Sequence, residues 1–63
     1  MDDFKERLIK EQHELNDKLS KLSSFLFTDN FYRLGPEQKR LLMMQHKAMD
    51  MYLLCLNERL KLL

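Results

Sequence analysis

The sequence contains one glycine, one proline and no tryptophan among its 63 residues, and the glycine and proline are adjacent at Gly35 and Pro36. Glycine and proline are the two residues that disfavour a helix interior most strongly. Their depletion therefore predicts an all-α chain with a single break. The sequence also contains one cysteine, Cys55, which excludes a disulfide within the chain.

Long apolar runs are also missing, and none approaches the roughly 18 residues of a membrane span. Met1 is followed by Asp2 and Asp3, whereas a secretory signal begins with basic residues and an apolar core. These absences argue against a membrane partner and against secretion. We expect a cytoplasmic protein, which would act in the host cytosol if it is viral.

A strong charge of one sign is absent too. Lys and Arg total 11 and Asp and Glu total 10, which leaves a net charge of +1. Coating a nucleic-acid polymer requires an excess of positive charge, so we expect no such partner. His13, His46 and Cys55 are too scattered for a structural zinc set, and the order of residues shows no nucleophile–base pair. We expect no metal, no cofactor and no catalytic residue, which makes an enzyme the weakest hypothesis.

The short chain makes a lone core marginal, because a single domain of this size buries little apolar surface. Ordering each residue costs about 1.5 kcal/mol, which buried apolar area must offset at about 25 cal/mol per Å². Small proteins add disulfides, a metal or further copies of the chain. With the first two excluded by composition, oligomerisation is the route that remains.

The hydrophobic spacing predicts one helical-hairpin domain over residues 1–63. A first helix is expected over residues 3–27, a turn over 28–35 and a second helix over 36–63. Asp3 and Glu6 resemble a capping box at the start of the first helix. Pro36 suits the first position of the second helix, where its missing N–H would be unpaired anyway. Two helices joined by a short connection pack as antiparallel neighbours, so we expect a hairpin that assembles into a homo-oligomeric helical bundle.

The second helix carries two apolar stripes on different sides, each with steps of three and four residues. The first stripe contains Leu42, Met49, Tyr52, Leu56, Leu60 and Leu63. The second contains Leu41, Met44, Ala48, Met51, Cys55 and Leu62. One partner helix covers only one side. The second stripe is therefore the predicted oligomer interface, in which Cys55 acts as a small buried hydrophobe.

Polar residues interrupt the apolar stripes of both helices. Two interpretations remain open, because buried polar groups cost free energy unless they are paired. In the first, Glu11 pairs with Arg7 or Arg59 and Gln45 sets the helix register. In the second, a ligand site at a subunit boundary binds an anion and stacks a base on an aromatic ring. The candidate ligand-binding residues are Arg7, Lys10, Glu11, Gln45, Tyr52 and Arg59.

Two motifs, one in each helix, carry a resemblance that covers nearly the whole chain. The first reads Phe4-x-x-Arg7-Leu8-Ile9-x-Glu11, followed by Leu15-x-x-Lys18-Leu19-x-Lys21-Leu22-x-x-Phe25. The second reads Leu41-Leu42-x-x-Gln45-x-x-x-Met49-x-x-Tyr52, followed by Leu56-x-x-Arg59-Leu60. This pattern resembles small hairpin proteins of crAss-like and other phages. That group resembles, in turn, the helical-hairpin domain of phage anti-CBASS and anti-Thoeris sponges.

The resemblance implies a homo-oligomer, commonly a hexamer, that sequesters an immune signal without cleaving it. The implied ligands are cyclic di- or trinucleotides or signals of the cyclic ADP-ribose type. The chain is shorter than the better known sponges and lacks a recognisable copy of their nucleotide-contacting segment. Two other hypotheses therefore stay beside the sponge: a protein-binding inhibitor or adaptor of the anti-CRISPR kind, and a ligand-free structural bundle.

Overall fold

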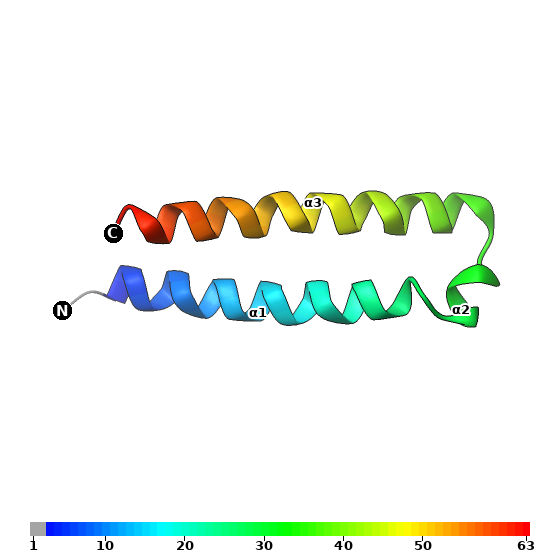
Figure 1. The fold of residues 1–63 in the computed structure, drawn as a ribbon, viewed down its shortest axis with the longest axis horizontal. Coiled ribbons are helices and arrows are strands. Elements are labelled where there is room, and N and C mark those ends of the chain that lie inside the picture. Colours follow the sequence, from blue (N-terminus) through cyan, green and yellow to red (C-terminus); the bar gives the residue numbers. More distant parts are fainter. Residues whose placement is uncertain (1–2) are drawn as a thin grey trace.

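The computed structural model of the chain describes residues 3–63 and contains three helices within them. Helix α1 spans Asp3–Phe25, α2 spans Asp29–Tyr32 and α3 spans Pro36–Lys61. Helices α1 and α3 lie side by side and antiparallel, and α2 lies at the closed end of the hairpin (Figure 1). The molecule is a rod of 49 × 14 × 13 Å. The all-helical hairpin predicted from the sequence is thus confirmed for a single chain.

The connection between the long helices is more structured than a plain turn. Helix α1 ends at Phe25 rather than at the predicted residue 27, because the chain turns where the Thr28 amide bonds the Phe25 carbonyl at 3.0 Å. The Thr28 hydroxyl donates to the same carbonyl at 2.7 Å and accepts from the Phe31 amide at 3.3 Å. Thr28 therefore closes α1 and caps α2, which places the Phe31 side chain in the interior.

The core runs along the seam between α1 and α3. Leu8, Leu15 and Leu56 form a buried cluster, against which Met49, Leu53 and Leu60 pack. An antiparallel hairpin with a short connection places Leu8 near Leu56 and Leu15 near Met49, and this cluster contains both pairs. The α3 members follow alternating steps of four and three residues, the spacing of a coiled-coil seam. No helix within residues 3–63 is long and apolar enough to span a membrane.

Two residues assigned to the first stripe do not belong to this seam. Tyr52 is 46% exposed, and Leu63 is exposed as well. Leu53 occupies the inward position instead. The reason is geometric: one residue turns an α-helix by about 100°, so Tyr52 lies beside the seam when Leu53 lies in it. The expectation that the partner helix covers Tyr52 and Leu63 was wrong.

Two polar contacts cross from α1 to α3. The Gln12 side-chain amide donates to the Asn57 Oδ1 at 2.6 Å, and the Ser23 hydroxyl and the His46 Nε2 are 2.6 Å apart. The polar neighbours Gln45 and Lys47 predict a solvated His46, but its side chain is only 25% exposed. Both contacts join the same side of the two helices. On the opposite side of the hairpin, Arg59 of α3 contacts the ring of Phe4 of α1.

Candidate functional site

An uncovered apolar stripe runs along α3 on a side that α1 does not reach. We call it the outer stripe; its six members, all exposed in the single chain, are Leu41, Met44, Ala48, Met51, Cys55 and Leu62. Cys55, expected to be buried, is therefore open to solvent unless a second molecule covers it. A row of exposed apolar side chains of this kind is typical of an interaction site rather than of an isolated small protein.

The predicted ligand residues of α3 lie along one edge of the hairpin. The Arg59 guanidinium carbon is 5.8 Å from the centroid of the Phe4 ring, a cation–π contact between the two helices. The contact between Phe4 and Arg59 sets the register of the two antiparallel helices. Seven residues from it along each helix, or about two turns, Glu11 of α1 lies level with Tyr52 of α3. Gln45 lies seven residues before Tyr52, and its amide nitrogen is 3.9 Å from the Met49 sulfur. The edge is thus a row of polar and aromatic groups.

The two remaining ligand candidates, Arg7 and Lys10, belong to a separate hollow on α1. This hollow of about 420 Å³ is lined by Arg7 and Lys10 together with Asp3 and Glu6. The Arg7 Nε donates to the Asp3 carbonyl at 3.3 Å, and the Lys10 ammonium lies 3.9 Å from a Glu14 carboxylate oxygen. Two acids balance the two cations, so the hollow offers an anion little net attraction.

The six predicted ligand residues are therefore not gathered into one pocket of the single chain. The expected pairing of Glu11 with Arg7 or Arg59 is also not present within residues 3–63. Glu11 is half-buried, while Arg7 bonds a backbone carbonyl and Arg59 lies over Phe4. A ligand that bridges these residues would have to be held between copies of the chain.

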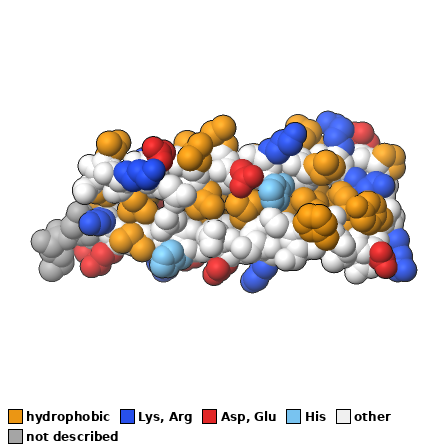
Figure 2. Space-filling view, viewed as in Figure 1, with side chains coloured by type: hydrophobic (Ala, Val, Ile, Leu, Met, Phe, Trp, Pro, Cys, Tyr) orange, Lys and Arg blue, Asp and Glu red, His pale blue; other side chains and the backbone are white. Residues whose placement is uncertain are grey.

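A larger hollow lies at the other end of the molecule, between α2 and the first turns of α3. We call it the closed-end groove; it has a volume of about 520 Å³ and is lined by Phe31, Tyr32, Pro36, Lys39, Arg40, Met43, Met44 and Lys47. Hydrophobic side chains gather at this end, with Lys and Arg side chains around them (Figure 2). The groove combines three cations with an exposed tyrosine and contains no carboxylate among its lining residues.

One contact across the hairpin resembles part of a hydrolytic triad. The Ser23 Oγ is 2.6 Å from the His46 Nε2, and the His46 Nδ1 is 3.9 Å from an Asp50 carboxylate oxygen. The order of residues did not indicate this contact, because Ser23 and His46 are 23 positions apart in the chain. Neither of the two hollows described above is lined by Ser23 or His46, so the contact is best explained as a satisfied polar pair at the seam. Within residues 3–63, no group of His, Cys, Asp and Glu is placed to hold a metal ion.

Comparison with known proteins places the chain in a family. A model of the Sequestin family matches residues 2–62. The chain belongs to the Sequestin family. The family name indicates a protein that sequesters a ligand. Neither the curated proteins nor the solved structures that were compared gave a match.

The closed-end groove of this Sequestin chain was not predicted from the sequence. The sequence predicts that Phe31 and Tyr32 plug the closed end of the hairpin, and it indicates no role for Lys39, Arg40 or Lys47. A signal was present, because the lining residues of α3 follow the i, i+3, i+4, i+7 spacing of one helix face: Pro36, Lys39, Arg40, Met43, Met44 and Lys47. The spacing alone does not show that α2 packs beside this face of α3 and forms one side of the groove. That placement depends on the tertiary structure.

Proposed function

We propose that this protein is a phage anti-defence sponge. It assembles through the outer stripe and sequesters a nucleotide immune signal of the bacterial host without cleaving it. The signal is a cyclic di- or trinucleotide or a compound of the cyclic ADP-ribose type, and the resemblance to anti-CBASS and anti-Thoeris sponges implies a hexamer in the host cytosol. The observation that carries the proposal is membership of the Sequestin family over residues 2–62.

The exposed outer stripe supports the assembly part of the proposal. Four of its members are large apolar side chains that remain open to solvent in the single chain: Leu41, Met44, Met51 and Leu62. Covering them with a second copy removes apolar area from water, at about 25 cal/mol per Å². In a symmetric contact between identical stripes, each apolar side chain is buried in both copies, so its contribution to the free energy of association counts twice. Oligomerisation thus supplies the burial that a chain of this length lacks.

Energetics favour a site that is completed by assembly. A nanomolar Kd corresponds to about −12 kcal/mol. Two charged contacts to phosphates contribute about 1.5–3 kcal/mol each, and two stacked bases about 1–3 kcal/mol each, so about 5–12 kcal/mol in total. Association itself costs at least about 4 kcal/mol of this. An open hollow on one chain therefore falls short of nanomolar affinity, and burial between subunits must supply the difference.

Calorimetry tests the proposal directly. The assembled protein is titrated with 3′,3′-cyclic GMP–AMP, cyclic tri-AMP, and cyclic ADP-ribose and its isomers. We expect submicromolar binding of at least one compound, with a stoichiometry that matches the number of copies. After prolonged incubation and denaturation, chromatography should recover that compound intact. No heat across the whole panel from an assembled protein would overturn the sponge, and a cleaved product would overturn sequestration without cleavage.

The outer stripe also supports one alternative function. A long apolar helix face is the element that amphipathic helices lay into the groove of a partner protein. A protein-binding inhibitor or adaptor would use the stripe in this way, as a single hairpin. Pull-down from host lysate separates the two functions, since the adaptor retains a stoichiometric protein and no nucleotide.

A further inference from the structure

We propose that the closed-end groove is where this chain holds its nucleotide, with Tyr32 stacking a base and Lys39 and Lys47 neutralising two phosphate charges. The inference rests on the proposed function and assigns it a location at the opposite end from Arg7, Lys10 and Arg59. The groove's volume of about 520 Å³ lies within the range of small-molecule sites, about 300–1,000 Å³.

Tyr32 is an exposed aromatic ring that the interior holds in place. Its ring is 5.5 Å from the buried Phe31 ring at an interplanar angle of 72°, and Phe31 in turn makes an edge contact with Phe25 at 6.2 Å. Tyr32 nevertheless remains 64% exposed. An aromatic ring that contacts a buried ring and is still largely exposed is suited to stacking on a base.

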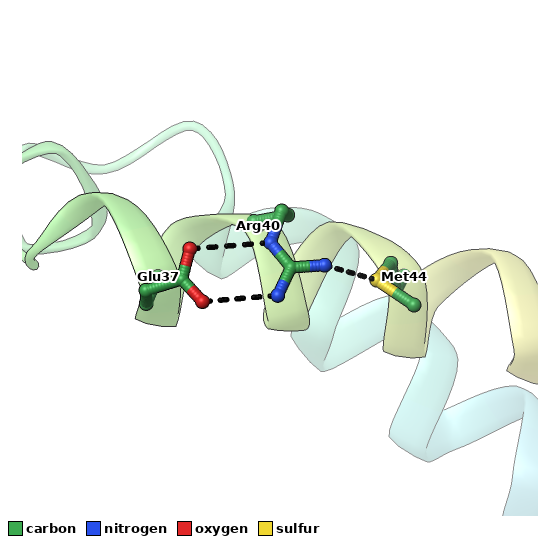
Figure 3. Close-up of polar contacts among 3 residues, drawn as sticks. All are labelled: Glu37, Arg40 and Met44. Carbon is green, nitrogen blue, oxygen red and sulfur yellow. Dashed lines mark hydrogen bonds and ion pairs between the residues drawn. The ribbon is translucent and has the colours of Figure 1, made fainter.

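The charges of the groove suit a ligand with two phosphates. Arg40 is held by Glu37 through two hydrogen bonds of 3.3 and 3.0 Å, and its third donor lies 3.3 Å from the Met44 sulfur (Figure 3). Lys39 and Lys47, in contrast, have no side-chain partner within residues 3–63. The groove therefore presents two uncompensated positive charges, which match the two phosphates of a cyclic dinucleotide or of cyclic ADP-ribose.

The groove is also continuous with the predicted assembly face. Met44 belongs both to the groove lining and to the outer stripe. A second copy packed on the outer stripe would come beside the groove and exclude water from one side of it. The closed end thus meets the requirement for burial between subunits.

Tyrosine fluorescence distinguishes the two ends of the hairpin, because the chain has no tryptophan and only two tyrosines, Tyr32 and Tyr52. The variants Tyr52→Phe and Tyr32→Phe each leave one fluorophore. Both are titrated with the panel compound that wild type binds, after correction for nucleotide absorbance. We expect quenching in Tyr52→Phe, where Tyr32 reports, and none in Tyr32→Phe. The reverse result would place the ligand at the open end and overturn the inference.

Affinities of charge variants provide an independent measurement. Lys39→Gln/Lys47→Gln should weaken binding by about tenfold or more, since each substitution removes one charged contact to a phosphate, at a half-buried position for Lys39 and an exposed one for Lys47. Tyr32→Leu should weaken it by about five- to 150-fold, the value of one stacked base. The matched control Lys18→Gln/Lys21→Gln removes the same charge from α1, and Lys10→Gln tests the other hollow. Circular dichroism and native mass confirm that each variant is folded and assembled.

The outcomes separate the inference from the function on which it rests. If wild type binds none of the nucleotides, the proposed function and the inference both fail. If wild type binds, and Lys39→Gln/Lys47→Gln binds within about twofold of it, the inference alone fails and the sponge stands. A loss confined to Lys10→Gln would return the site to the open end.

Discussion

Assembly through the outer stripe predicts that two similar leucines of α3 differ sharply in their response to a charge. Leu41 lies in the outer stripe and is 47% exposed, whereas Leu54 lies on another side of α3 and is 51% exposed. Each is replaced by lysine. In the single chain the two substitutions remove similar apolar area, so the hairpin should tolerate them equally, within about 0.5 kcal/mol of unfolding free energy.

The magnitude follows from the exposed fraction. Full burial of a leucine side chain is worth about 1.5–3 kcal/mol. About half of Leu41 remains to be covered, so its burial in an interface adds about 0.7–1.5 kcal/mol per copy. A symmetric contact contains two copies and therefore loses about 1.5–3 kcal/mol in Leu41→Lys, which raises the dissociation constant by about ten- to 150-fold. The lysine stem extends its charge to solvent, so repulsion adds little to this value.

Sedimentation velocity over a concentration series measures the effect. Leu41→Lys should shift the assembly midpoint by about one to two decades, while Leu54→Lys should sediment like wild type. Two results would refute the reasoning. One is a Leu41→Lys variant that assembles normally, and the other is a Leu54→Lys variant that dissociates equally, which would mean that a different side of α3 forms the interface.

Three further predictions concern the hairpin itself and are measured by urea unfolding at one fixed protein concentration, because assembly contributes to apparent stability. Leu56→Ala leaves a cavity at the most buried position of the core and should lower the free energy of unfolding by about 2–5 kcal/mol. The control Leu54→Ala, at an exposed position, should lower it by well under 1 kcal/mol. Equal losses in the two variants would contradict the described seam. Thr28→Ala removes the cap between α1 and α2 and should cost about 1 kcal/mol, with Thr28→Ser retaining most of the stability if the hydroxyl is what matters. Gln12→Ala and Asn57→Ala should show a coupling energy of about 0.5–1.5 kcal/mol in a double-mutant cycle, and additive effects would mean that their 2.6 Å contact does not form in solution.

Tyr52 and His46 are the two residues whose burial depends most clearly on the neighbouring helix rather than on the sequence around them. The period of the apolar residues was enough to predict the helices, but Tyr52 and Leu53 are adjacent apolar residues that satisfy a helical stripe almost equally well. Only the position of α1 decides which of them is covered. His46 was misjudged for a related reason: its neighbours in the sequence are polar, whereas its neighbour in space is Ser23 of α1.

The amino-acid order by itself determined the two long helices, the break at Gly35 and Pro36, and the surplus of apolar surface on α3. These are local properties, set by propensity, by capping and by the turn per residue of a helix. The tertiary structure alone decided which residues share a hollow. The short helix α2 lies against the first turns of α3 and so adds Tyr32 to Lys39 and Lys47, while Arg7 and Lys10 are left apart from Tyr52. Such a grouping depends on how one helix is placed against another, and that placement depends on the core and the connection rather than on spacing within either helix.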